Sequence, residues 1–423
     1  MALPLIYSVR SIAVRKGSSA MAVLGIALVV VVFVTLLALA AGFSKAVECS
    51  GSPQNIIVLR KGADAELQSQ ITLDTARIIS ELPCVATDAG GQRLCVWESV
   101  VILSRPKRGE GEASFTVRGT KPLSREVHSE VRLKEGRWLT PGTTEAIVGS
   151  GLVGRMENLG LGQSVTIGRN TWRIVGVFEA AGSSLESELW MDGPLMQSAF
   201  RRGGIFQSVL FRAAGEPHAA LQQLKALLGE AETEIRGHDP VEIRGHDPDF
   251  QTAGNRVMSP DFDPRLETVE AQSEDEYYRK QAKLVSDLIT ILGGLLTGIM
   301  AIGAITGAMN TMYAAVSQRK SEIGCLLAMG FTPDAIWLAF MAESLLLSCI
   351  GALLGCVISL AFNGMKTGTT NWATFSETAF EFTITPEILA VASLLALLMG
   401  FIGGVLPAFR AARMKVVDAL RRA

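Results

Sequence analysis

The sequence lacks the local motifs on which most enzymes depend. It contains no G-x-x-x-x-G-K-[ST] loop for the phosphates of ATP, and it contains no H-E-x-x-H zinc motif. Val148-Gly-Ser-Gly151 and Ala181-Gly-Ser-Ser184 come near a G-x-S-x-G nucleophile elbow without matching it, and their glycines fit turns. With four histidines and no Cys-x-x-Cys spacing, zinc is not expected. The sequence therefore predicts a non-catalytic chain with no cofactor and no metal of its own.

An excess of charge of one sign is also lacking, and cysteine is scarce. The formal net charge of −2 at pH 7 gives no reason to expect a nucleic-acid partner. Cys49, Cys84 and Cys95 lie in the polar central region of the chain. Their odd number allows at most one internal disulfide there, and a Cys84–Cys95 bond would close the shortest loop. The other three cysteines lie in or near apolar stretches, where we expect them to pack as small apolar side chains.

What the sequence does contain is four long apolar stretches, at residues 20–43, 284–316, 335–362 and 387–409. About 20 apolar residues cross a bilayer as a helix, so each stretch is long enough to span a membrane. A cleaved signal peptide is the alternative for the first stretch, because Ala38-Leu39-Ala40 has the composition of a cleavage site. We expect a retained anchor instead, because the apolar core of a signal peptide is usually only about 7–15 residues long.

The basic residues predict how the chain is oriented. Arg and Lys are enriched before the first stretch, between the second and third, and after the fourth, and such residues favour the cytoplasmic side. We therefore expect a multi-pass protein of the cytoplasmic membrane with both termini inside and the large insert outside. Residues 1–19 read as an amphipathic cytoplasmic lead-in, residues 20–43 as the first span, and residues 44–281 as an extracytoplasmic domain. Residues 282–423 hold the other three spans.

The insert mixes strand and helix patterns, which predicts an α+β domain of one or two lobes. Helices are expected at Leu67–Glu81 and Pro217–Gly229, and a charge-rich helix from Glu267 to Lys283 is expected to continue into the second span. The expected strands are Asn55–Arg60, Val96–Leu103, Ser114–Arg118, Ala146–Val148, Ser164–Ile167, Trp172–Phe178 and Ser208–Phe211. The predicted fold class is a four-helix membrane protein, arranged one plus three, around a large extracytoplasmic α+β domain.

One short repeat stands out in the insert. Glu234-Ile-Arg-Gly-His-Asp-Pro240 recurs as Glu242-Ile-Arg-Gly-His-Asp-Pro248. His238, Asp239 and their counterparts could be read as a metal site. A duplicated surface loop is the favoured reading, because Gly-His-Asp-Pro has the composition of a turn.

Three motifs together carry a family resemblance. The first is Gln318-Arg-Lys-Ser-Glu-Ile-Gly-Cys-Leu-Leu-Ala-Met-Gly-Phe331, in the predicted inner loop. The second is Leu406-Pro-Ala-Phe-Arg-Ala-Ala-Arg413 followed by Val417-Asp-Ala-Leu420. The third is Glu135-Gly-Arg-Trp-Leu-Thr-Pro-Gly142 with Trp172-Arg-Ile-Val-Gly-Val-Phe178. Over nearly its whole length the chain resembles ABC transporter permeases of the FtsX-like, MacB type.

The resemblance implies domains and partners. Residues 44–281 correspond to a MacB-like periplasmic core domain, and residues 282–423 correspond to an FtsX-like permease domain with a coupling helix at about 318–331. It implies an ABC ATPase on a separate polypeptide, which would bind ATP and Mg²⁺, and a second permease subunit. Membrane lipid is a further partner, and a periplasmic adaptor or a lipoprotein is a candidate partner.

The candidate site residues follow from the same motifs. Those expected to couple to the ATPase are Arg319, Lys320, Glu322, Ile323, Gly324, Leu326, Leu327 and Gly330. Glu343 is an acid within a span, where it is expected to face protein or, if it lies near the inner surface, water. Small residues at four-residue spacing let membrane helices approach closely, and they are Gly294, Gly298, Gly303, Gly307, Gly351, Gly355, Gly400 and Gly404.

The function expected from these observations is that of a permease subunit. It would couple ATP hydrolysis in the partner to movement of the extracytoplasmic domain, which would drive export, efflux or lipoprotein release. The alternative is a membrane-anchored sensor or scaffold that regulates an extracytoplasmic partner such as a cell-wall hydrolase.

Overall fold

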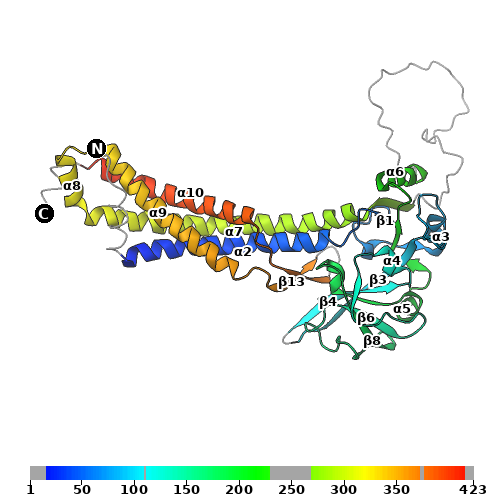
Figure 1. Cartoon of the computed structure of the whole chain (residues 1–423). Helices are drawn as coiled ribbons and strands as arrows, with labels where there is room; N and C mark the ends of the chain where they lie inside the picture. The colour runs from blue at the N-terminus through cyan, green and yellow to red at the C-terminus, as the bar shows by residue number, and fades with distance from the viewer. Residues whose placement is uncertain (1–15, 109–110, 229–267, 372–375, 415–423) are drawn as a thin grey trace, which may run out of the picture. The chain divides into compact units, whose positions relative to one another are not determined.

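The computed structural model describes residues 16–108, 111–228, 268–371 and 376–414 (Figure 1). Most of the predicted lead-in at 1–19, the Ile-Arg-Gly-His-Asp-Pro repeat and the C-terminal motif Val417–Leu420 lie outside these residues. Contacts divide the chain into two units. The helical unit comprises Met1–Ser44, Leu284–Thr367 and Glu381–Ala423. The α+β unit comprises Lys45–Lys283 and Gly368–Phe380.

Four helices of the described chain are long and apolar enough to cross a membrane: α2 (Lys16–Glu48), α7 (Glu274–Gln318), α9 (Pro333–Leu360) and α10 (Pro386–Ala412). The short helix α8 (Lys320–Ala328) connects α7 to α9. Thr-Pro pairs start α9 and α10, because the threonine hydroxyl caps the first turn and proline has no N–H to leave unpaired there. The expected fold class, with one span before the α+β insert and three after it, is confirmed.

Two buried apolar clusters hold the helical unit together. One joins Ile26, Val30 and Val34 of α2 to Ala396 and Met399 of α10. The other gathers side chains at the α8 end of the helices, from α7, α8, α9 and α10: Met312, Ile323, Ile336, Phe340 and Ala408. Large apolar side chains on the remaining surfaces of these helices are exposed, as expected where lipid would surround them.

The α+β unit is built on one mixed sheet in the order β12-β1-β11-β3-β4-β9-β6-β8-β5, with β7 paired to β8. The strands are β1 (Asn55–Arg60), β3 (Cys95–Pro106), β4 (Glu112–Thr120), β5 (Arg132–Gly136), β6 (Glu145–Gly149), β7 (Ser164–Ile167), β8 (Asn170–Glu179), β9 (Glu188–Asp192), β11 (Ser208–Arg212) and β12 (Val269–Ser273). Two smaller sheets pair β2 (Ile71–Thr72) with β10 (Ile205–Phe206), and β13 (Lys366–Asn371) with β14 (Ser376–Glu381).

Strand β3 is shared by two lobes. Residues Cys95 to Glu98 pair with β11, and residues Ser99 to Pro106 pair with β4. On one side, helices α3 (Leu73–Ser80) and α6 (Pro217–Leu227) cover a core that contains Ile56, Ile79 and Leu224. On the other, α5 (Gly193–Phe200) covers a core that contains Phe115 and Trp172. The short helix α4 (Ser124–Val127) follows β4.

Two predicted helices begin later than the sequence indicated. Only Leu73–Ser80 of the segment Leu67–Glu81 is α-helical, because Ile71–Thr72 forms β2 and the Thr72 hydroxyl caps α3 by accepting from the Thr75 amide. Likewise, Val269–Ser273 forms β12 against β1, and the helix starts at Glu274. From there α7 continues without a break to Gln318, as expected.

The Cys84–Cys95 disulfide that the sequence left open is not formed. Both thiols are free and buried. The Cys84 carbonyl accepts from the Ala214 amide at 2.8 Å, whereas Cys95 pairs with Phe211.

Candidate functional site

Helix α8 carries most of the residues predicted to couple to an ATPase. Lys320 and Glu322 are exposed, Leu326 and Leu327 are half-buried, and Gly330 follows the helix with a φ of +93°. Such a φ is in the left-handed region, where glycine is the favoured residue, so Gly330 ends α8 and turns the chain toward α9.

Ile323 and Gly324 face the helical unit itself. Ile323 is 2% exposed and packs in the same cluster as Met312 and Ile336. The sequence had placed Ile323 on an apolar stripe available to a partner, and in this structure it is not available. The side of α8 that is open to solvent carries Glu322, Cys325 and Met329 instead, and Met329 is 69% exposed.

The intramembrane acid Glu343 is buried and paired. Its Oε2 atom lies 3.3 Å from Nη1 of Arg319, and Nε of the same arginine lies 3.1 Å from Oε2 of Glu322. Glu343 itself is 2% exposed. A buried charge is tolerated when it is paired, so Arg319 accounts for an acid inside the third span. The arrangement also ties the start of α8 to α9.

The predicted glycine pairs divide into two groups. In α9 and α10, an added Cβ would collide with a neighbouring helix at Gly355, Gly400 and Gly404 and would be tightly crowded at Gly351; at Gly355 it would lie 2.7 Å from Val30. These four glycines therefore permit close helix contacts. The four glycines of α7, by contrast, have nothing within 4 Å of an added Cβ: Gly294, Gly298, Gly303 and Gly307.

A second site, absent from the sequence predictions, is a buried charge cluster in the α+β unit. Arg118 of β4 donates to Glu66 at 2.9 and 3.0 Å, to Glu98 at 2.8 Å and to Glu188 twice at 2.8 Å. All five N–H bonds of the guanidinium are thereby used. The four side chains are at most 9% exposed. We call these four residues the Arg118 cluster.

His128 extends the Arg118 cluster. Its Nε2 atom lies 3.2 Å from Oε1 of Glu98, and its Nδ1 atom lies 3.9 Å from Oε1 of Glu274. Burial disfavours the charge on each group, but attraction outweighs it in both. The charges of His128 and Arg118 lower the pKa of Glu98 to about 2, and the charge of Glu98 raises the pKa of His128 well above its usual range.

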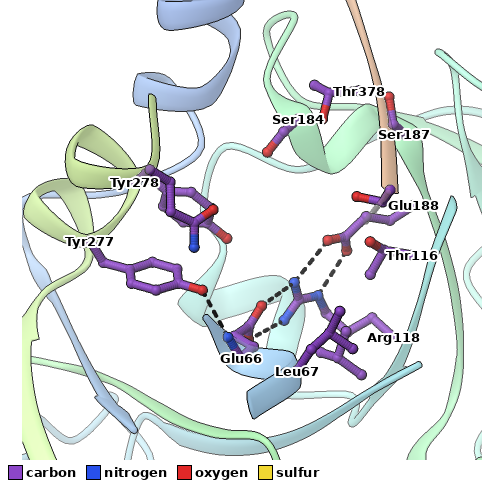
Figure 2. A pocket seen from close by; sticks show the side chains of 13 residues that line it. Glu66, Leu67, Thr116, Arg118, Ser184, Ser187, Glu188, Tyr277, Tyr278 and Thr378 are labelled. Carbon is purple, nitrogen blue, oxygen red and sulfur yellow. Dashed lines mark hydrogen bonds and ion pairs between the residues drawn. The ribbon is translucent and has the colours of Figure 1, made fainter. Parts of the chain in front are cut away.

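The cluster borders a small polar cavity (Figure 2). Hydroxyl groups of Tyr277, Ser184, Ser187 and Thr378 also line it, and the Tyr277 hydroxyl accepts from the Glu66 amide at 3.1 Å. Its free volume of about 30 Å³ suits roughly two water molecules and is far below the several hundred Å³ of a typical ligand site. Since Arg118 has no donor left, the cavity does not present a site for an anion.

Sequence reasoning missed the Arg118 cluster because its members have no local pattern. They come from a 3-10 turn and three strands, and each glutamate looks like a surface residue on its own. The one available clue was Arg118 inside an otherwise buried strand. In the described parts of the chain, no three His, Cys, Asp or Glu side chains are grouped as metal ligands.

The helices and the insert define an integral membrane protein with one span before, and three after, a folded domain. Models of two known families match this layout. The model of the MacB-like periplasmic core domain matches residues 19–230, and that of the FtsX-like permease C-terminal region matches residues 294–416. The chain belongs to the ABC transporter permeases that combine these two domains.

Curated relatives match parts or most of the chain. The uncharacterized ABC transporter permease YknZ of Bacillus subtilis is 30% identical over 33% of this chain and 33% of its own length. The pyoverdine export ATP-binding/permease protein PvdT of Pseudomonas entomophila is 25% identical over 96% of this chain and 58% of its own length. The chain thus spans from a third to somewhat over half of these two relatives.

Solved structures of similar domains also match. The periplasmic region of MacB from Actinobacillus actinomycetemcomitans aligns with 42% of this chain and 86% of its own, at 13% identity and a TM-score of 0.31. The extracellular domain of YknZ from Gram-positive bacteria aligns with 41% of this chain and 93% of its own, at 17% identity and a TM-score of 0.30.

Proposed function

We propose that this chain is the membrane subunit of an ABC complex whose ATPase is a separate polypeptide. Helix α8 docks on that ATPase, which binds ATP and Mg²⁺, and a second permease copy completes the complex. Both termini and α8 lie on the cytoplasmic side of the membrane, and the α+β unit lies outside. The distribution of Lys and Arg around the spans supports this orientation.

The observation that carries the proposal is the two-sided placement of α8. Ile323 anchors the helix in the apolar cluster of the helical unit, while Cys325 on its other side and Met329 just past its end are exposed to solvent. A short helix that is fixed on one side and free on the other suits docking into a groove.

The connections of α8 support transmission of movement. Its N-terminal end follows α7 with only Arg319 between them, and the Arg319–Glu343 pair ties that end to α9. Displacing α8 would therefore move both helices, and α7 is one continuous helix from Glu274. The spans carry too few polar side chains to line an aqueous pore. The complex therefore uses ATP hydrolysis to move the external domain, and this movement drives export, efflux or lipoprotein release.

The cargo belongs to one of those classes in this proposal. The names of two relatives refer to the export of pyoverdine and of macrolides, respectively. A periplasmic adaptor or a lipoprotein is the external partner that fits these classes.

The test replaces exposed residues of α8. We expect Met329→Asp and Glu322→Lys to weaken binding of the cognate ATPase at least about tenfold, because the altered charge would have to leave water at the docking surface. Insertion into the membrane should be unchanged, since both side chains are exposed. The measurements are pull-down of the ATPase and its rate of ATP hydrolysis in the reconstituted complex.

Leu161→Asp is the matched control, because Leu161 is a 46% exposed apolar residue of the α+β unit. It should bind and stimulate the ATPase like the parent. If both α8 variants bind and stimulate the ATPase normally, the ATPase does not dock through α8. If no ATPase binds the parent, the sensor or scaffold alternative is favoured.

A further inference from the structure

The middle of the loop between α9 and α10 belongs to the α+β unit. It forms the hairpin of β13 and β14, and contacts assign Gly368–Phe380 to the α+β unit although α9 and α10 belong to the helical unit. The chain therefore passes between the units in three places: within α2, within α7 and at this hairpin. The first two passages are continuous helices. At the third, side-chain contacts hold the hairpin to the rest of the α+β unit.

Glu377 of β14 makes two of these contacts. Its Oε2 atom lies 2.7 Å from Nζ of Lys107, and its Oε1 atom bonds to Nη2 of Arg155. The Glu377 side chain is 9% exposed. Both carboxylate oxygens are thus used by cations that lie 222 and 270 positions earlier in the chain. We call these three residues the Glu377 clamp.

The surroundings are shaped to this ion pair. A Cβ added to Gly368 of β13 would collide with the Arg155 guanidinium and with the Glu377 carboxylate. Two residues after Glu377, the Ala379 amide donates to Oγ of Ser187 at 2.8 Å. This hydrogen bond holds β14 against the turn that precedes β9. The buried ring of Phe380 ends the attached segment.

We infer that Glu377 is a positioning residue that couples α9 and α10 to the α+β unit. The inference rests on the proposed function, because it gives the transmitted movement a second route besides α7. Covalent continuity guarantees the passages through α2 and α7. In contrast, the direct route from α9 and α10 to the α+β unit depends on the hairpin between them staying attached to that unit.

The test uses Glu377→Gln in the full-length complex with its ATPase, reconstituted in lipid nanodiscs. The variant should fold, because the cations it releases, Lys107 and Arg155, are 36% and 30% exposed and water can solvate them. Hydrogen exchange is measured without nucleotide and with ADP plus vanadate. We expect amides of β14 to exchange about tenfold faster in the variant, the change that loss of a charge-assisted hydrogen bond produces.

The readout that separates coupling from simple stability is the response to nucleotide. In the parent we expect nucleotide to change exchange in β14 and in residues Ser184–Asp192 together. In Glu377→Gln the response of Ser184–Asp192 should be lost, while ATPase binding stays normal. Glu381→Gln is the control on the same strand. The Glu381 side chain is 55% exposed, and its ion pair with Lys366 is long, at 3.8 Å, so its loss should have little effect.

A covalent replacement provides the rescue. The 2.8 Å contact between Ser187 and Ala379 holds their Cα atoms within the roughly 7 Å that a disulfide requires. Ser187→Cys with Ala379→Cys, oxidised by copper phenanthroline, should restore the response in the Glu377→Gln background, and dithiothreitol should remove it again. A normal response in Glu377→Gln overturns the coupling role alone. No nucleotide response anywhere in the parent overturns the proposed function along with it.

Discussion

Replacing Arg118 by methionine is the most informative perturbation of the α+β unit. The change removes all five hydrogen bonds of the Arg118 cluster and leaves three buried carboxylates without their shared cation. Removing one partner of a buried ion pair costs about 3–5 kcal/mol. We therefore expect a loss of at least about 4 kcal/mol at pH 7, which is a large part of a typical domain stability of about 5–15 kcal/mol.

The pH dependence of that loss follows from the same carboxylates. Without Arg118, the buried carboxylates lose their shared cation, and binding a proton removes charge that burial and mutual repulsion disfavour. An acid with a raised folded pKa binds protons more tightly when folded, so its stability contribution is present at low pH and disappears as pH rises. Arg118→Met should therefore be least destabilised near pH 5 and most destabilised at neutral pH.

The assay is urea unfolding of the full chain in detergent, followed by tryptophan fluorescence. Trp190 is a suitable reporter, because its indole donates to Glu188 at 2.7 Å. Arg137→Met is the control, since the Arg137 side chain is 55% exposed and solvent screens its pair with Glu145. A loss below about 1 kcal/mol for Arg118→Met, or one unchanged between pH 5 and 7, would refute the reasoning.

Two further predictions concern pH and helix packing. The lowered pKa of Glu98 adds stability that is lost as pH falls toward 2, and the raised pKa of His128 adds stability that is lost as pH rises well above 6.5. His128→Gln should therefore abolish the alkaline decline in urea midpoint; an identical decline in the variant would contradict this. Gly355→Ala should cost about 1–3 kcal/mol by overpacking against Val30, whereas Gly298→Ala, with open space, should cost nothing in thermal unfolding; equal effects would disprove the assigned contact.

Hydropathy was sufficient for the spans because a bilayer demands about 20 apolar residues in a row, a property that a sequence displays directly. Strands such as Asn55–Arg60 were also readable. Strand β9 was not: all five of its residues are buried, yet it begins with Glu188 and ends with Asp192. Its burial depends on Arg118, which lies 70 positions earlier.

The candidate sites show the same division between local and distant information. The motif around α8 located the helix, but helical spacing alone does not reveal which side packs inward, so the burial of Ile323 was missed. The partner of Glu343 was likewise not evident, because Arg319 is separated from it by the whole of α8 and a turn. Where partners are distant in sequence, only the folded chain identifies them.

The pairing of β1 with β12 has an evolutionary consequence. Ile56 lies opposite Ser273 in this ladder, so the segment inserted between α2 and α7 begins and ends on adjacent strands. An insert whose two ends are neighbours can be exchanged for another folded module without changing the separation of the chain segments it interrupts. A permease of this design can therefore diversify the module between α2 and α7 by recombination at two nearby junctions, while its membrane helices and the short helix α8 stay as they are.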